Sequence, residues 1–359
     1  MCSPFSCIQG GAGVGKTTTV SEIIKEVKQV LTVVTVTFTH KAKRCVEKRL
    51  HEAGITDVTT STIHSFIMRL KGMRFARILL LIDESSMVDL ELMGELAKQM
   101  MEFCDAYQLC FVGDTMQLPS VGRGEIYRMM IDAAGPHVKS LVQCYRTDRA
   151  DLFDAYQAIR EGRLPPTSEH FKLELFDDDG GIDGFAAGFI ARHSDAYMYV
   201  AWQNKDVARI NKMVQAEMVK SGRVGPRAWG QFYMHDRVVY RGENKEHLTN
   251  AMTGTVVDVK SDGMTVKWDD CAEVTVFKKD ARGVQLMYCG TCHIMQGSEY
   301  KQVCVLCYDI VKMIKCSDRK WIYTAVTRAQ DNVVLAATRE LDIFVAHQLA
   351  DAPLSGLSF

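Results

Sequence analysis

Apolar and β-branched runs alternate with amphipathic stretches through the first 145 residues. Runs such as 33–37 (VVTVT) and 77–83 (RILLLID) predict strands, because β-branched and apolar residues favour extended backbone. The stretches 17–30, 41–53 and 87–103 carry apolar residues at helical spacing. Strands that alternate with helices predict a parallel sheet with helices on both of its faces.

The alternation resumes after residue 148 and is interrupted once by a β-rich segment. A strand at 197–202 and a helix at 205–220 are followed by two runs, 255–260 and 264–268, which form a predicted hairpin around Ser261-Asp262-Gly263. Strands at 284–287 and 302–308 are expected to return to the α/β pattern. We therefore predict an α/β chain with a first lobe at 1–147, a second lobe at 148–230 and 285–359, and a small β-barrel inserted at 231–284.

The composition indicates where the protein is located but does not identify a binding partner. The 359 residues have a formal net charge of −1, so bulk charge does not itself indicate nucleic acid. No apolar run reaches the length of a membrane span and the start lacks the features of a signal peptide, so we expect an intracellular protein without a membrane partner. One local cluster is strongly basic: Lys41, Lys43, Arg44, Lys48 and Arg49.

The 12 cysteines are expected to be free thiols, as is usual inside cells. Two CxxC pairs, Cys289/Cys292 and Cys304/Cys307, have spacing that also suits a zinc site. The second pair lies in an apparent buried strand, where residues three apart point to opposite faces. Zinc is therefore the less favoured interpretation.

The segment from Gly10 to Thr17 (GGAGVGKT) matches the phosphate-binding pattern G-x-x-x-x-G-K-[ST] at every fixed position. It follows a predicted strand and opens a predicted helix, so backbone N–H groups would face a phosphate. Lys16 is expected to bind the β- and γ-phosphates, and Thr17 to bind Mg²⁺. The predicted nucleotide-binding residues of this loop are Gly10, Gly11, Ala12, Gly13, Val14, Gly15, Lys16, Thr17 and Thr18.

A second part of the nucleotide site ends the strand at 77–83. Two carboxylates, Asp83 and Glu84, follow an apolar run, which is the Walker B arrangement. Asp83 is expected to bind Mg²⁺ with Thr17, and Glu84 to activate the attacking water. ATP or another nucleoside triphosphate, with Mg²⁺, is the predicted cofactor.

Further motifs, in order along the chain, resemble superfamily 1 helicases of the RecD-like group, superfamily 1B. They are 83–89 (DESSMVD), 112–122 (VGDTMQLPSVG), 141–146 (LVQCYR), 291–299 (TCHIMQGSE) and 323–329 (YTAVTRA). The resemblance implies two RecA-like lobes with ATP hydrolysed at their interface. It gives Gln117 a γ-phosphate-sensing role, Arg146 a nucleotide contact and Arg328 the role of arginine finger, and it adds Gly297 and Glu299 to the nucleotide site.

The resemblance also implies a nucleic-acid track, placed on the face opposite the nucleotide. Hydroxyl and Lys side chains suit phosphate contacts, and aromatic rings suit base stacking. Each position has an ordinary structural alternative, such as a helix cap for Thr39, a core position for Phe66 and a turn for His64. The predicted track residues are Thr39, His40, Lys41, Thr62, His64 and Phe66 in the first lobe and Thr291 and His293 in the second.

Two departures from the family pattern affect the expected activity. Nine residues precede Gly10, which leaves out the Gln segment that reads adenine in the family, so several nucleoside triphosphates are expected to serve. The segment 67–77 is short for a strand-separating pin, which favours translocation over strong unwinding.

The leading hypothesis is an ATP-dependent translocase or helicase on single-stranded DNA, with 5′→3′ polarity implied by the resemblance. It would act as a monomer, with replication or recombination proteins as potential partners, and its compact form suggests a viral or mobile-element source. One alternative is a viral-type RNA helicase with RNA 5′-triphosphatase activity. Another is a nucleotide-gated binding module with little unwinding, which the intact Lys16, Asp83, Glu84, Gln117 and Arg328 disfavour.

Overall fold

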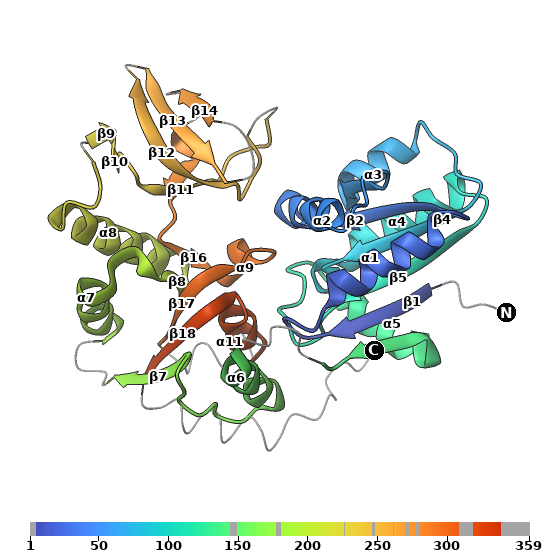
Figure 1. Ribbon diagram of the computed structural model, residues 1–359. Helices are drawn as coiled ribbons and strands as arrows, with labels where there is room; N and C mark the ends of the chain where they lie inside the picture. Colours follow the sequence, from blue (N-terminus) through green and yellow to red (C-terminus); the bar gives the residue numbers. More distant parts are fainter. Residues whose placement is uncertain are drawn as a thin grey trace. The chain divides into compact units, whose positions relative to one another are not determined.

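The computed structural model describes residues 5–143, 149–176, 181–225, 227–245, 248–260, 262–269, 273–277, 281–308 and 319–338. The chain divides into two compact units, Met1–Asp148 and Arg149–Phe359 (Figure 1). No helix in these described ranges is both long enough and apolar enough to cross a membrane.

Unit 1 is built on a six-stranded sheet with the strand order β3-β2-β4-β5-β1-β6. Every pairing in it is parallel, which confirms the prediction from the alternating pattern. The strands are β1 (Phe5–Gly10), β2 (Thr32–Thr37), β3 (Thr59–Thr62), β4 (Ile78–Asp83), β5 (Tyr107–Gly113) and β6 (Val138–Leu141).

Helices cover both faces of this sheet. On one face, α1 (Lys16–Val27) and α2 (His40–Glu52) share an apolar cluster with the strands. On the other face, α3 (Ile63–Leu70), α4 (Leu90–Phe103) and α5 (Ile126–Ala134) share a second cluster. The sequence pattern had not predicted α3 or α5.

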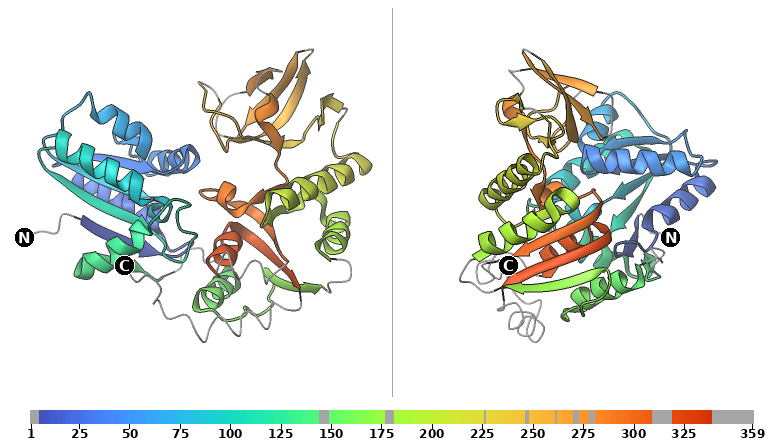
Figure 2. Two further views of the ribbon diagram at one scale, coloured as in Figure 1. Left: turned by 180° about the vertical axis from the view of Figure 1, so that it is seen from behind. Right: turned by 60° about the vertical axis from the view of Figure 1, so that its left-hand side comes forward.

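Unit 2 contains a second parallel sheet, in the order β16-β8-β17-β18-β7. Figure 2 shows α7 and α8 on one face of it and α6 and α11 on the other. The strands are β7 (Phe171–Phe176), β8 (Met198–Ala201), β16 (Cys289–Thr291), β17 (Tyr300–Cys307) and β18 (Ala329–Thr338). The helices are α6 (Ala150–Glu161), α7 (Gly181–His193), α8 (Asn204–Lys220), α9 (Cys292–Met295) and α11 (Arg319–Val326).

The β-rich segment forms an antiparallel sheet in the order β14-β13-β12-β11-β15. Its strands are β11 (Arg237–Tyr240), β12 (Thr253–Lys260), β13 (Gly263–Trp268), β14 (Glu273–Phe277) and β15 (Val284–Leu286), and the shorter β9 (Arg227–Trp229) and β10 (Phe232–Tyr233) pair beside it. In the described residues β14 and β15 are its two ends, so closure into a barrel stays a prediction.

One strand assignment was wrong. The run at 284–287 was expected to return the chain to the α/β lobe, but β15 pairs antiparallel with β11 and so completes the inserted sheet. The insert also shares its hydrophobic core with the parallel lobe, because Val266 and Trp268 of the insert belong to the same apolar cluster as Tyr199 and Ile210 of the lobe. The return to the lobe occurs at β16.

The cysteines of the two CxxC pairs are buried. Cys304 and Cys307 lie in β17, and Cys289 and Cys292 lie in β16 and at the start of α9. Burial raises the pKa of the thiols of Cys289, Cys292 and Cys307. Among the described residues no group of three or more His, Cys, Asp or Glu side chains could hold a metal ion.

Candidate nucleotide site and nucleic-acid track

The predicted nucleotide residues of unit 1 share one edge of its sheet. Because the strands are parallel, the carboxyl ends of β1, β4 and β5 meet there, and these ends carry Gly10, Asp83 and Gly113. The register places Thr37 of β2 beside Asp83 on one side and beside Thr62 on the other. The track residues that follow β2 and β3 therefore share this edge with the nucleotide residues and are separated from them along it. The expected placement of the track on the face opposite the nucleotide stays a prediction.

The phosphate loop has the backbone that its glycines allow. Gly13 and Gly15 have φ angles of 75° and 79°, which side chains with a Cβ rarely adopt. Val14 between them is buried and anchors the loop to the lobe. The loop is thus a fixed concave turn between β1 and α1.

The first turn of α1 differs from those of its neighbours. Helices α2, α3 and α4 begin with side-chain caps from Thr39, Thr62 and Asp89, each of which accepts from the backbone N–H three residues on. Gly15, which precedes α1, supplies no side-chain cap. The first N–H groups of a helix lack partners within it, so this end suits an anion such as phosphate.

Two cations contact groups of this loop. Lys16 Nζ donates to the carbonyl oxygens of Gly10 at 2.9 Å and Gly11 at 2.8 Å. Arg49 of α2 donates from Nη1 to Thr17 Oγ1 at 2.7 Å. Positive charge is therefore concentrated where the sequence predicted phosphate binding.

Asp83 and Glu84 lie side by side at the end of β4. Glu84 has a φ of 53°, and its backbone N–H donates to Asp83 Oδ1 at 3.0 Å. Burial, with the neighbouring charge of Glu84, raises the pKa of Asp83, while Lys16 and Arg49 oppose that rise. The Asp83 carboxylate and the Thr17 hydroxyl are hard oxygen donors, which are the ligands that Mg²⁺ prefers.

The loop after β5 is held to the same edge by buried polar contacts. Ser85 Oγ donates to Ile82 O at 2.6 Å and accepts from the backbone N–H of Val112 at 3.2 Å, which joins the ends of β4 and β5. Gln117 is buried, and its backbone N–H donates to Asp114 O at 3.1 Å. Gln117 thus belongs to a loop fixed beside the phosphate loop, as a γ-phosphate sensor would require.

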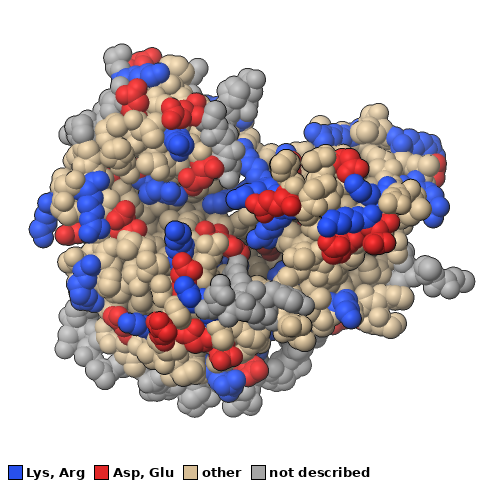
Figure 3. All heavy atoms as spheres, viewed as in Figure 1, with Lys and Arg blue, Asp and Glu red and all other residues tan. Residues whose placement is uncertain are grey.

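The first-lobe track residues follow β2 and β3. Thr39 Oγ1 and Thr62 Oγ1 cap α2 and α3, so the structural alternative for both threonines is realised. His40 begins α2, and partial burial with the nearby charges of Lys43 and Arg44 lowers its pKa, which favours the uncharged form of its ring. Figure 3 shows Lys and Arg side chains, with acidic ones between them, over the part of unit 1 where α2 lies; Lys41 belongs to this helix.

Phe66 was wrongly expected to stack on bases. Its ring is only 3% exposed and packs in the apolar cluster between the sheet and α3. Phe38 is an aromatic residue of this edge that the sequence analysis missed. Its ring is half-buried, and the centroids of the Phe38 ring and the exposed His64 ring lie 6.3 Å apart in an edge-on arrangement. The buried β-branched run of β2 is continuous from Val33 to Thr37 and ends there, so the position of Phe38 directly after this run is the signal that could have identified it.

In unit 2 the predicted arginine finger is engaged inside its own lobe. Arg328 is 5% exposed, and its Nε donates to Thr324 O at 3.0 Å while Nη1 is 3.5 Å from Ser298 O. Two nearby polar atoms, Gln296 Nε2 and Ser298 Oγ, are buried without a hydrogen-bond partner among the described residues. A γ-phosphate contact by Arg328 would require it to exchange these internal bonds.

The other predicted residues of unit 2 lie close to that cluster in sequence. Thr291 ends β16, and His293 is exposed in α9. Gly297 has a φ of 73°, and Glu299 accepts from Gln330 Nε2 at 3.0 Å. Arg146 lies outside the described residues.

Unit 2 also holds Thr291 and His293 in place through a residue that belongs to none of the sequence motifs. Asn211 of α8 accepts from the backbone N–H groups of Tyr288 and Cys289 and donates to Cys289 O, all within 3.0 Å. It therefore fixes the chain where it leaves the insert and enters β16, directly before Thr291 and His293.

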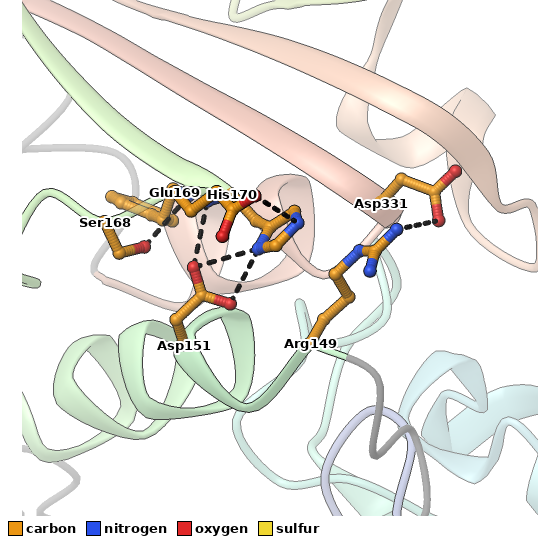
Figure 4. A network of polar contacts seen from close by, with 7 residues as sticks. Arg149, Asp151, Ser168, Glu169, His170 and Asp331 are labelled. Carbon is orange, nitrogen blue, oxygen red and sulfur yellow. Dashed lines mark hydrogen bonds and ion pairs between the residues drawn. The ribbon is translucent and has the colours of Figure 1, made fainter.

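A second support fixes the start of α6 (Figure 4). The Asp151 carboxylate accepts from the backbone N–H of His170 at 2.9 Å and contacts His170 Nδ1 at 3.0 Å. Burial acts to raise the pKa of Asp151, but hydrogen bonds from His170 and Ser168 outweigh it and lower this pKa to about 2. Arg149, the residue before α6, lies 3.9 Å from Asp331.

Two family models match the chain. The model described as AAA domain matches residues 2–186, and that described as UvrD-like helicase C-terminal domain matches residues 286–336. An uncharacterised protein of Methanocaldococcus jannaschii, MJ1519, is 35% identical over 195 residues, which is 46% of this chain and 16% of that protein. The chain thus spans about a sixth of the length of the curated relative that it matches.

Solved structures of Pif1 helicases have a similar fold. Bacteroides Pif1 bound to single-stranded DNA has a TM-score of 0.53 at 16% identity, with 96% of this chain and 92% of that chain covered. Pif1 from Candida albicans also has a TM-score of 0.53, at 18% identity, with 96% and 94% covered. A structure of two coordinating Pif1 helicases at forked double-stranded DNA has a TM-score of 0.55 at 16% identity, with 92% and 87% covered. These likenesses confirm a fold of two RecA-like lobes.

Proposed function

Because this chain belongs to the AAA-domain family and carries both halves of a superfamily 1B helicase, we propose that it hydrolyses ATP to move along single-stranded DNA. The observation that carries this proposal is the edge of the unit 1 sheet. There an uncapped helix, a glycine loop with Lys16 and a pair of carboxylates converge.

Each side chain of this edge has a role that its position supports. Lys16 would exchange its bonds to Gly10 O and Gly11 O for bonds to phosphate oxygens, so its ammonium group would keep its hydrogen-bond acceptors when the nucleotide binds. Thr17 and Asp83 would hold Mg²⁺, which neutralises phosphate charge when bound. Glu84, whose backbone is turned back by its positive φ, would accept the proton of the attacking water.

The finer contacts remain part of the proposal. Gln117 would sense the γ-phosphate from the loop after β5, while Arg328 and Arg146 would contribute positive charge during phosphoryl transfer. Gly297 and Glu299 would complete the nucleotide site. Arg328 would be released from Thr324 O and Ser298 O before it could act, which links its role to a change within unit 2.

The DNA track would use the groups that follow β2 and β3 in unit 1 and β16 in unit 2. Backbone phosphates would be bound by Lys41 and by hydroxyl and amide groups at the helix starts, and bases would stack on the half-buried Phe38 and the exposed His64 beside it. Thr291 and His293 would be the corresponding contacts of unit 2. We further propose 5′→3′ movement by a monomer inside the cell.

The test is ATP hydrolysis without polymer, with single-stranded DNA and with single-stranded RNA, in the wild type and in Lys16→Ala. Strong stimulation by DNA that disappears in Lys16→Ala is the expected result. Stimulation by RNA alone would instead support the RNA helicase alternative, with 5′-triphosphatase activity as its next test. Absence of hydrolysis under all three conditions would contradict the motor and leave a nucleotide-gated binding protein.

A further inference from the structure

Arg49 lies at the carboxyl end of α2 and reaches the first turn of α1, 32 residues earlier in the chain. Its Nη1 donates to Thr17 Oγ1 at 2.7 Å. This hydroxyl is the oxygen that the proposed function assigns to Mg²⁺. The Arg49 guanidinium and the proposed Mg²⁺ ion would therefore both contact the same oxygen atom, Thr17 Oγ1.

The charge of Arg49 is also felt by the second proposed metal ligand. Burial and the charge of Glu84 raise the pKa of Asp83, while Lys16 and, to a smaller extent, Arg49 act to lower it. The guanidinium that contacts Thr17 thus adds positive charge near two adjacent carboxylates.

Geometry makes the two cations unfavourable together. A Mg²⁺ ion about 2.1 Å from Thr17 Oγ1 would lie within about 5 Å of a guanidinium nitrogen that kept its present contact. Like charges at that separation repel each other. Arg49 is exposed and has a long side chain, so it could leave Thr17 without disturbing the core.

We propose that Arg49 competes with Mg²⁺ for Thr17 Oγ1, and so sets how firmly the site retains a metal–nucleotide product. Return of Arg49 to Thr17 would accompany departure of the metal and would speed release of Mg–ADP. This inference rests on the proposed function, because it assigns a regulator to the same nucleotide site. Lys16 would not compete with the metal in this way, because its Nζ donates to the carbonyl oxygens of Gly10 and Gly11 and not to the Thr17 hydroxyl.

The test measures binding and dissociation of fluorescent ADP, with Mg²⁺ and with a chelator, in the wild type and in Arg49→Met. In Mg²⁺ we expect Arg49→Met to bind ADP about threefold to fivefold more tightly, chiefly through slower dissociation, as suits one exposed charged contact. With the chelator its affinity should show no gain. Lys48→Met is the matched control, because Lys48 lies beside Arg49 on α2 and pairs at 3.9 Å with Glu52.

Two outcomes would overturn the inference while leaving the motor intact. If Arg49→Met lost the same affinity with and without Mg²⁺, Arg49 would be an ordinary nucleotide contact. If it matched Lys48→Met in both conditions, its contact with Thr17 would have no part in metal binding. If wild-type protein and Lys16→Ala bound ADP equally weakly whatever the Mg²⁺ concentration, the proposed function would fail and this inference with it.

Discussion

Gln9 Nε2 donates a hydrogen bond to Thr115 Oγ1 at 2.8 Å, which joins the strand before the phosphate loop to the loop that carries Gln117. The two residues are 106 positions apart, and neither belongs to a predicted set of site residues. The loop of Thr115 begins beside Gln9, because Gln9 pairs with Gly113, the last residue of β5. The contact thus connects the loop proposed to bind phosphate with the loop proposed to sense its loss.

Removal of this contact is expected to slow turnover more than it weakens ATP binding. Gln9→Leu should lower kcat about fivefold with little change in KM, since one hydrogen bond contributes about 1 kcal/mol. Steady-state kinetics of Gln9→Leu, Thr115→Val and the double variant would measure it. If the two residues act as one unit, the double variant should be no slower than either single variant; multiplied losses would contradict this. Gln108→Leu, exposed on β5, is the control.

The aromatic residues of the track should separate into one that supports folding and two that bind DNA. Phe66→Ala should destabilise unit 1 by about 3–5 kcal/mol, because it removes a buried ring. Phe38→Ala and His64→Ala should cost much less stability and weaken single-stranded DNA binding about tenfold, as expected for loss of base stacking. Thermal unfolding and fluorescence anisotropy would be compared; a stable Phe66→Ala with weakened DNA binding would reverse the assignment.

Asn211 is expected to be sensitive to loss of its amide. Asn211→Leu would leave two N–H groups and one carbonyl of Tyr288 and Cys289 without their present partner, in a buried setting. At about 1–3 kcal/mol for each such group, the loss should exceed about 3 kcal/mol. Differential scanning calorimetry would show it, with Asn204→Leu at the exposed start of α8 as control. A difference below about 1 kcal/mol would show that water replaces the amide.

Asp151 gives unit 2 a defined response to acid. Its pKa in the folded protein is about 2, below the ordinary 3.8, so the unfolded chain binds the proton more readily. The stabilisation is therefore present above pH 3.8 and is lost as pH falls toward 2. With its side chain 28% exposed, Asp151 should contribute about 1–2 kcal/mol.

Chemical denaturation of Asp151→Asn at pH 7 and at pH 3 would check this. The variant should be less stable than the wild type at pH 7, and the difference should shrink at pH 3. Asp154→Asn, exposed on the same helix, should show no such change with pH. A difference of the same size at both pH values would mean that the amide disturbs packing rather than charge.

The sequence predicted the strands of unit 1 and the turn between β1 and α1 well because their signals are local. Apolar runs such as 78–82 are buried as whole strands, and the glycines at 13 and 15 have the positive φ angles that the loop pattern requires. The insert strand at 284–286 was misassigned because an isolated run of apolar residues does not state whether its partner is parallel or antiparallel.

The contacts that complete the site could not be predicted, since they join residues far apart in the chain. Nothing near Arg49 in sequence indicates that it reaches Thr17, and nothing near Gln9 indicates Thr115. Phe66 was assigned to the track because the local sequence around a base-stacking aromatic residue and around a core aromatic residue of a helix is the same. Only the fold of α3 onto the sheet distinguishes them.

The pairing of β11 with β15 has an evolutionary consequence. Tyr240 and Val284 face each other in the register of these two strands, so the segment between them begins and ends at one place in the inserted sheet. Among the 43 residues between them, 241–283, the parts outside the apolar cluster can therefore lengthen, shorten or be exchanged in descendants, whereas Val266 and Trp268 are constrained because they pack in the same cluster as Tyr199 of β8. Selection can therefore change the outer surface of the segment 241–283 while the parallel sheet of unit 2 is inherited unchanged.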